Sequence, residues 1–460
     1  MPCHDDGVQR PGRVLGRRAL LGFGCGATLA GCASHRPAPD DSRRPAPDDT
    51  SATSVLAPTA ASTDGVEGTV ADVSALLAAR GRALLARDLD AAGAVFVTTA
   101  VHREAIRRSD SRALASGLVQ WAGDVTTVQD RVAQVGLRVR VLGEGREVRT
   151  SGQVGIVRAN GRWALSPSED PGPPMPWDLG DVQAHQVDGG VVLVVHPDGA
   201  GEPDALGVVA AGARADLPVA SARVDELWGA DWPRGAAVVV VPTSELAARL
   251  AALDPARVAV LDALAVGEDA RLPDGKPAGV RVVLAADRFS RLSRLGRTIT
   301  LTHELVHVAT RASTSVQPFA VGDNPLPRWL VEGYADHVAR VGRDVSARKL
   351  ATPLLDAIAG GAVPVVPTDA DFSTTDAEAL QVTYASAWTL VTSAARRAGT
   401  PSVSACYRAL ASAPEAGGVA AGPVAARLDA ACRATLGRGW AQVQQDWLAD
   451  VAGGLTGWTP

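Results

Sequence analysis

Two histidines four residues apart, with a glutamate directly after the first, stand in the segment THELVH (302–307). In a helix, residues i and i+4 lie one above the other on the same face, so His303 and His307 can direct two imidazole nitrogens at one metal ion. Zinc accepts such nitrogens at about 2.0–2.1 Å. Glu304 lies one position round the helix, where its carboxylate can reach a water on the metal without being a ligand. The HExxH spacing therefore predicts a zinc site that activates water.

A catalytic zinc site typically has three protein ligands and keeps a fourth position for water. The candidate for the third ligand is Glu332, within the segment PRWLVEGYAD (327–336). Proline is favourable in the first turn of a helix, so Pro327 indicates the start of a second helix that carries this glutamate. The alternative is an exposed carboxylate that is stabilised by the helix dipole.

Together, HELVH and WLVEGYAD resemble the gluzincin metallopeptidases, the thermolysin-like superfamily, which pair an HExxH helix with a later helix bearing W-L-x-E-G-x-A. The resemblance implies one zinc ion per chain, with His303, His307 and Glu332 as ligands and Glu304 as general base. It covers residues 302–336 closely. The interval between the two motifs is longer than in the best-known members, and no GxMEN motif is present, so aminopeptidase specificity is not implied.

Two further residues take roles from the same resemblance. Asp336 matches the position from which the family holds a ligand imidazole by its far nitrogen; a solvated aspartate and the third ligand of an aspzincin-like site are the alternatives. Tyr384, in QVTYASAWTLV (381–391), matches a tyrosine that stabilises the oxyanion in many members, and a core tyrosine is its alternative. His337 is expected to point away from the site, at the surface. The strand VRVVLA (280–285) precedes the HExxH segment, as the edge strand does in gluzincins, and an extended peptide could add to it if it is exposed at the cleft.

The first 32 residues resemble a bacterial lipoprotein signal. Arg17 and Arg18 precede an apolar stretch that ends in Leu-Ala-Gly-Cys32, a lipobox, so we expect lipid on Cys32 and export to the outer face of the cell membrane. An ordinary secretory signal is the alternative. Outside the cytoplasm an isolated cysteine pair is commonly oxidised, which predicts a disulfide between Cys406 and Cys432. Two buried free thiols are the alternative.

Patterning divides the rest of the chain into three parts. Residues 33–68 are rich in Pro, Asp, Ser and Thr and are expected to be a disordered tether. Residues 69–170 read as helices followed by alternating strands, with a hairpin signal at Asn160-Gly161, an order that resembles the NTF2-like and cystatin-like domains. Residues 176–460 read as strands first and helices second, as in a thermolysin-like zincin domain. The predicted fold class is α+β.

Composition narrows the possible functions. Hydrophobic residues make up 46% of the chain, which is enough for a substantial core, and the formal net charge of -5 argues against a nucleic-acid partner. The predicted function is zinc-dependent hydrolysis of peptide bonds in a peptide or protein substrate. The alternatives are a zinc-stabilised lipoprotein that binds a partner without catalysis, and an envelope interaction protein in which HELVH is coincidental. Substrate identity and oligomeric state are not predicted.

Overall fold

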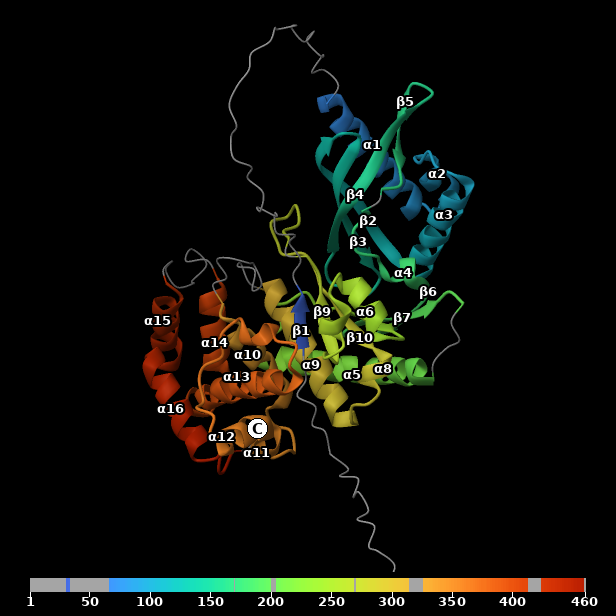
Figure 1. The fold of residues 1–460 in the computed structure, drawn as a ribbon. Helices are drawn as coiled ribbons and strands as arrows, with labels where there is room; N and C mark the ends of the chain where they lie inside the picture. Colours follow the sequence, from blue (N-terminus) through green and yellow to red (C-terminus); the bar gives the residue numbers. More distant parts are fainter. Residues whose placement is uncertain are drawn as a thin grey trace, which may run out of the picture.

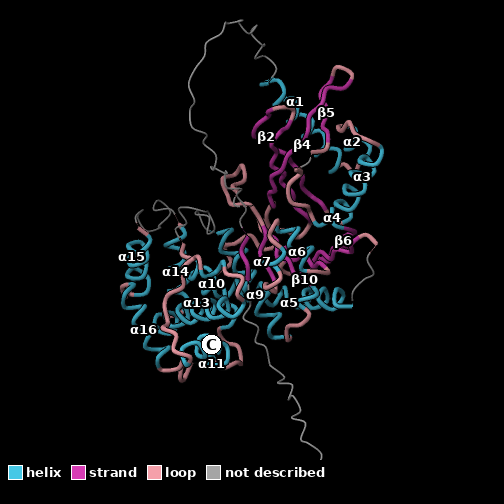
Figure 2. Tube along the Cα trace, viewed as in Figure 1, coloured by secondary structure: helices cyan, strands magenta, loops and turns pink. Residues whose placement is uncertain are grey.

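The computed structural model describes residues 30–33, 66–168, 170–199, 204–268, 270–313, 326–412 and 423–458. Most of the predicted signal sequence and tether therefore lies outside the described residues. Strands occur only before residue 286 in the described chain, and after it the described residues form helices joined by loops (Figure 2). The α+β class predicted from the sequence is confirmed.

The N-terminal unit consists of helices followed by an antiparallel sheet with the strand order β2-β3-β4-β5. Val73 and Leu77 of the first helix pack against the sheet, where they meet Ile156 and Leu165 in one small core. The first helix begins at Val66, three residues before the predicted boundary. The elements are α1 (Val66–Leu85), α2 (Leu89–Ala94), α3 (Ala100–Ala115), β2 (Leu118–Gln129), β3 (Val132–Val141), β4 (Val148–Ala159) and β5 (Arg162–Ser166).

The hairpin predicted at Asn160-Gly161 joins β4 to β5. Both turn residues have positive φ, 50° at Asn160 and 75° at Gly161. A two-residue turn of this kind follows the right-handed twist of the strands, and Asn-Gly adopts it at little cost. The likeness of the whole unit to NTF2-like domains stays a prediction.

The larger unit begins with a six-stranded sheet in the order β1-β9-β10-β8-β7-β6. The strands β6 and β7 form an antiparallel hairpin that turns at residues 188–189, and β7, β8 and β10 run parallel to one another. Thr243 caps the helix after β8 by accepting a hydrogen bond from the backbone N–H of Leu246. The elements are α4 (Pro176–Leu179), β6 (Gly180–Val187), β7 (Gly190–Pro197), α5 (Asp204–Leu227), β8 (Ala236–Val241), α6 (Ser244–Ala251), α7 (Pro255–Val258), β9 (Ala263–Val266), β10 (Arg281–Ala285) and α8 (Ala286–Phe289).

The expected edge strand is not at the edge. VRVVLA forms β10, but β10 lies between β8 and β9, so the prediction that it offers a free edge is wrong. The strand β9 runs antiparallel beside it. The backbone of β1 (Ala30–Ala33) pairs in parallel with β9. Strand order depends on pairing between distant segments, which the local pattern of β10 does not encode.

Helices make up the rest of the larger unit and gather on one side of the sheet, at the lower left of Figure 1. The longest, α13, lies at the centre of this group and packs on its neighbours through Leu380, Trp388 and Val391. The helices are α9 (Arg294–Ser313), α10 (Arg328–Arg340), α11 (Ala347–Leu350), α12 (Thr352–Ala359), α13 (Ala377–Ala398), α14 (Thr400–Ala411), α15 (Val424–Leu436) and α16 (Trp440–Ala452), with a 3-10 turn at Asp371–Ser373.

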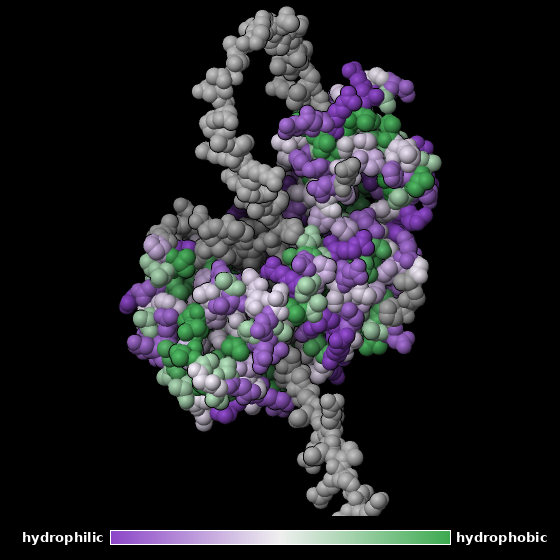
Figure 3. Space-filling model, viewed as in Figure 1, coloured by the Kyte–Doolittle hydropathy of each residue, from purple (hydrophilic) through white to green (hydrophobic). Residues whose placement is uncertain are grey.

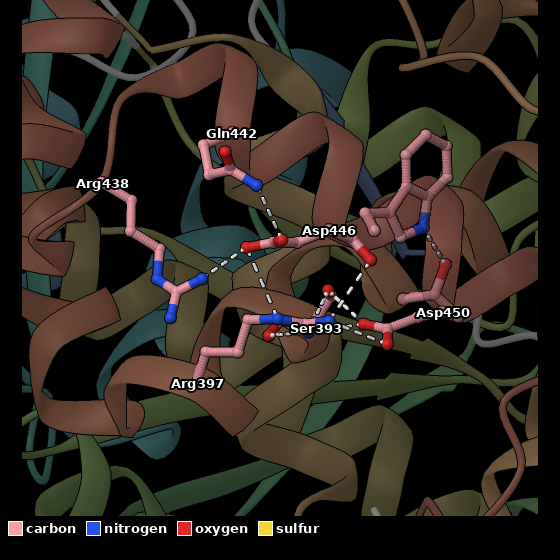
Figure 4. Close-up of polar contacts among 8 residues, drawn as sticks. Ser393, Arg397, Arg438, Gln442, Asp446 and Asp450 are labelled. Carbon is pink, nitrogen blue, oxygen red and sulfur yellow. Dashed lines mark hydrogen bonds and ion pairs between the residues drawn. The ribbon is translucent and has the colours of Figure 1, made fainter.

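A polar network ties α13 to α16 at the rim of this helical layer (Figure 4). Arg397 makes two hydrogen bonds to the carboxylate of Asp450, at 2.6 and 2.9 Å. Asp446 receives a hydrogen bond from Arg438 at 2.7 Å. Paired two-point contacts between a guanidinium and a carboxylate fix orientation as well as adding energy. The network therefore sets the angle of α16 against α13.

The two units share a buried interface. Arg281 of β10 makes two hydrogen bonds to Glu144, at 2.6 and 3.0 Å, and both side chains are almost fully buried. Leu118 and Val139 of the N-terminal unit also belong to the same apolar cluster as Val283. The N-terminal unit is thus built against the central sheet rather than joined to it by a linker alone.

Among the described helices, α5 is long and apolar enough to cross a membrane by length and composition. Its residues Val209, Leu217 and Val224 are fully buried in the core of the larger unit. This packing is that of a core helix lying on a sheet. On the face shown in Figure 3, hydrophobic residues gather in separate patches among hydrophilic ones.

Candidate metal centre

The HExxH segment lies on α9, as predicted. Three of its apolar residues, Leu301, Leu305 and Val306, are at most 1% exposed and fix the helix in the core. His303 and His307 occur one turn apart and are also buried, His303 completely. Because the apolar positions hold the helix on one side, the two imidazoles project together from the other.

Glu332 lies on α10, which packs against both α9 and α13. Gly333, the next residue, is the reason that α13 can come so close. A Cβ atom at this position would lie 2.4 Å from the carbonyl oxygen of Ala387. Only glycine fits such an approach of one helix to another backbone. Glu332 thus directs its carboxylate from one face of α10, while Gly333 lets α13 pack closely against another face.

The two helices bring His303, His307 and Glu332 into one buried group. The Nε2 atoms of the two histidines are 3.0 Å apart. Oε2 of Glu332 lies 3.3 Å from Nε2 of His303 and 3.5 Å from Nε2 of His307. A tetrahedral zinc ion with bonds of about 2.0–2.1 Å separates its ligand atoms by about 3.3–3.4 Å. The three side chains therefore fit a zinc ion in donor type and in spacing.

The far side of His303 is held by a carboxylate. Its Nδ1–H donates to Oδ1 of Asp336 at 3.0 Å, and Asp336 is fully buried rather than solvated. The same oxygen lies 3.0 Å from a terminal nitrogen of Arg340, whose guanidinium stacks over the ring of Trp388. This contact leaves Nε2 of His303 as the atom that can bind a metal.

The buried imidazoles and carboxylates of the site shift one another's pKa values. Burial opposes protonation of His303, but its hydrogen bonds to Asp336 and Glu332 outweigh burial and raise its pKa to about 10. Burial likewise opposes the charge of Glu332, yet His307 and His303 hold the pKa of this carboxyl below its usual range. Burial lowers the pKa of the His307 imidazole. A cation bound to these atoms would displace the proton, since a metal-bound imidazole must be neutral.

Glu304 is placed to act on a group held by the other three residues. Burial raises the pKa of its carboxyl to about 8, the positive charge of His303 opposes that rise, and the negative charge of Glu332 adds to it. Neither carboxylate oxygen makes a well-formed hydrogen bond to a described residue, although the backbone of Ala265 on β9 lies close enough to favour the charged form. With a pKa of about 8 the carboxyl holds a proton at neutral pH, and a cation bound by the other three residues would favour the charged form that can accept one.

Tyr384 occupies a core position on α13 and is 1% exposed. Its ring packs edge-to-face on Phe372, with centroids 5.3 Å apart. Phe372 in turn lies under the guanidinium of Arg328. This placement matches the core-tyrosine alternative, and a role for Tyr384 with an oxyanion stays a prediction.

His337 points away from the metal centre, as expected, but it is 3% exposed, so the expected surface position is wrong. Its two ring nitrogens lie 3.1 Å from Oγ1 of Thr392 and 2.9 Å from Oγ1 of Thr400. Packing of α10 against α13 and α14 buries this face of the helix. Burial, with Arg223 adding to it, lowers the pKa of His337 to about 4.

The predicted disulfide is replaced by two buried thiols in the structure. Cys406 on α14 and Cys432 on α15 are buried free cysteines whose side chains lie close enough to interact. The structure therefore has the alternative of two buried free thiols in place of the predicted disulfide. Apolar packing of α14 against α15 holds both thiols, since free cysteine behaves as a small hydrophobic side chain. Lipid on Cys32 stays a prediction, because only the backbone of β1 is described.

Sequence reasoning missed two arginines of the site. Arg340 reaches Asp336, and Nε of Arg328 lies 3.6 Å from Oε1 of Glu332. Each arginine is four residues from its carboxylate on α10. Such i,i+4 pairs of opposite charge were readable from the sequence.

Comparison with family models, curated proteins and solved structures finds no match to this chain. The likeness to gluzincins therefore rests on the residues 302–336 and on the geometry that brings them together.

Proposed function

We propose that this protein is a zinc-dependent peptidase that hydrolyses peptide bonds at the outer face of the cell membrane. One observation carries the proposal. His303, His307 and Glu332 come from two helices and place their ligand atoms 3.0–3.5 Å apart, with the buried carboxylate of Glu304 beside them. Two imidazoles and one carboxylate are the donor set of catalytic zinc in several peptidases.

Zinc at this site would lower the pKa of a bound water and polarise a scissile carbonyl. Glu304 accepts the proton of the attacking water and delivers it to the leaving amine, which is the work of a general base followed by a general acid. Asp336 holds the imidazole of His303 in the tautomer that offers Nε2. The lipobox-like segment that ends at Cys32 supports export and a lipid anchor.

The test combines metal analysis with digestion of a peptide library by the purified protein. We expect about one zinc ion per chain and cleavage by the wild type. Glu304→Gln should keep the zinc and lose at least about a hundredfold in hydrolysis, because the general base is removed. Glu378→Gln, an exposed carboxylate at the start of α13, is the matched control and should cleave normally. A protein without stoichiometric zinc would contradict the proposal.

A second function is favoured by one observation. His303, Glu304 and Glu332 are completely buried, as ligands are in closed structural zinc sites. The alternative is a zinc-stabilised lipoprotein that binds a partner without catalysis. Equal absence of hydrolysis in the wild type and in Glu304→Gln, with zinc retained in both, would support it.

A further inference from the structure

A small cavity of about 20 Å³ lies one residue away from the candidate metal centre and shares the side chain of Arg328 with it. One of its walls is Arg328, whose Nε lies 3.6 Å from Oε1 of Glu332. The cavity is bordered on the other sides by Arg257, Tyr384 and Phe372. Its walls therefore come from α7, α10, α13 and the 3-10 turn between α12 and α13. A space of this volume holds about one water-sized group, so only the end of a ligand can enter it.

The lining of this cavity carries two positive charges and no negative one. Arg257 and Arg328 contribute guanidinium groups, and the lining contains no aspartate or glutamate. Arg257 is half-buried, and its side chain makes no hydrogen bond or ion pair with any residue that the structure describes. A partly buried guanidinium without a counter-charge favours an anion, because desolvation strengthens the attraction.

The guanidinium of Arg328 is held in place by its neighbours. It lies over the ring of Phe372, 5.4 Å from the centroid. Its backbone N–H donates to the carboxylate of Asp369 at 2.8 Å, which fixes the start of α10. Since Nε of this guanidinium faces Glu332, its planar fork is oriented by that contact and by the ring of Phe372.

We propose that Arg257 and Arg328 bind a carboxylate of the substrate beside the metal centre. This inference rests on the proposed function and narrows its substrate class to peptides with a carboxylate close to the scissile bond. The carboxylate can belong to the C-terminus of the peptide or to an aspartate or glutamate side chain. Hydrolysis itself is unchanged, and the two arginines act on binding and orientation.

The test compares three peptides of the same length and apolar sequence with the zinc-loaded protein. The first has a free C-terminal carboxylate, the second a C-terminal amide, and the third an amide with one glutamate placed beside the cleaved bond. For the wild type we expect kcat/KM to be roughly ten- to a hundredfold higher for the first or the third peptide than for the second. The reason is the added hydrogen bond between a charged carboxylate and a charged guanidinium. The better of the two carboxylate peptides identifies the source of the carboxylate.

Arg257→Gln should reduce this preference to near unity, and Arg328→Lys should reduce it in part, because lysine keeps the charge but not the planar fork. Zinc content is measured on each variant to separate loss of the metal from loss of the anion site. Arg433→Gln, at an exposed arginine of α15, is the matched control and should keep the full preference. Equal kcat/KM for all three peptides, or a preference that survives Arg257→Gln, would overturn the inference.

A separate experiment distinguishes failure of the proposed peptidase function from failure of the anion site. If no peptide is cleaved, binding of the same three peptides to zinc-loaded Glu304→Gln is measured by calorimetry. Tighter binding of a carboxylate peptide that is lost in the double variant with Arg257→Gln upholds the anion site without peptidase activity. Equal binding of all three peptides overturns the anion site as well.

Discussion

At the scale of single residues, the geometry of the candidate metal centre depends on Asp336 as well as on the three residues that would bind the metal. Asp336 does not belong to the group that would bind the metal, yet it receives the hydrogen bond of His303 and lies against Arg340. The orientation of the first histidine therefore depends on a residue from the other helix. Both motifs must be in place before the site has its geometry.

Replacement of Asp336 by asparagine tests this dependence. We expect the affinity for zinc to fall by about ten- to a hundredfold, because the imidazole loses the partner that fixes its tautomer. Competition with a chelator of known affinity measures the change. Asp356→Asn, on the exposed face of α12, should leave zinc affinity unaltered. Unchanged affinity in Asp336→Asn would show that His303 is held by other means.

His337 gives the protein a predicted pH dependence of stability. Its pKa of about 4 in the folded state lies below the ordinary value of 6.5, so the unfolded chain binds the proton more readily. The contribution to stability is complete above pH 6.5 and is lost as the pH falls towards 4, by about 3 kcal/mol in all. In urea unfolding, His337→Gln should flatten the decline between pH 7 and 4.5 by about 2 kcal/mol. Exposed His102→Gln should keep the wild-type slope, and an equally steep decline in both variants would contradict this account.

At the scale of elements, close approach of α10 to α13 holds Glu332 in position. Gly333→Ala would place a methyl group 2.4 Å from the carbonyl oxygen of Ala387. We expect a loss of roughly 1–3 kcal/mol in the free energy of unfolding, as for other overpacked cores. Urea denaturation measures it.

The matched control is Gly207→Ala on α5, where an added methyl group meets nothing within 4 Å. This substitution should stabilise the protein by roughly 0.5–1 kcal/mol, because alanine is the better helix former. Equal effects at residues 207 and 333 would show that the contact between α10 and α13 is looser than the structure has it.

Local sequence patterns predicted which segments form helices, strands and turns. They did not predict which of these elements lie side by side in the fold. The Asn160-Gly161 turn was readable because its chemistry is contained in two residues. The position of β10 was not, because an apolar run such as VVLA fits any buried strand, and the short β9 carried no alternating pattern to mark it as a neighbour of β10. Burial of His337 also depends on α13 and α14, far along the chain. The residues of the candidate metal centre were predictable because their spacing is a property of one helix and one short motif.

At the scale of the whole molecule, the N-terminal unit and the larger unit are joined by a buried ion pair. Glu144→Gln would leave the charge of Arg281 without its partner inside the protein. Breaking one side of a buried pair typically costs about 3–5 kcal/mol. We expect a loss of that order in the free energy of unfolding, measured in urea.

An exposed pair provides the comparison. Asp90→Asn removes the partner of Arg107 at the surface and should change stability by less than about 1 kcal/mol. A small effect of Glu144→Gln as well would mean that the two units are coupled by apolar contact alone.

The central claim is that one zinc ion is held jointly by α9 and α10. Crystals of the purified protein, measured on both sides of the zinc absorption edge, test it most directly. We predict one anomalous peak about 2.0–2.2 Å from Nε2 of His303, Nε2 of His307 and a carboxylate oxygen of Glu332. Absence of a peak there in protein supplied with zinc, or a peak that leaves Glu332 uncoordinated, would contradict the account.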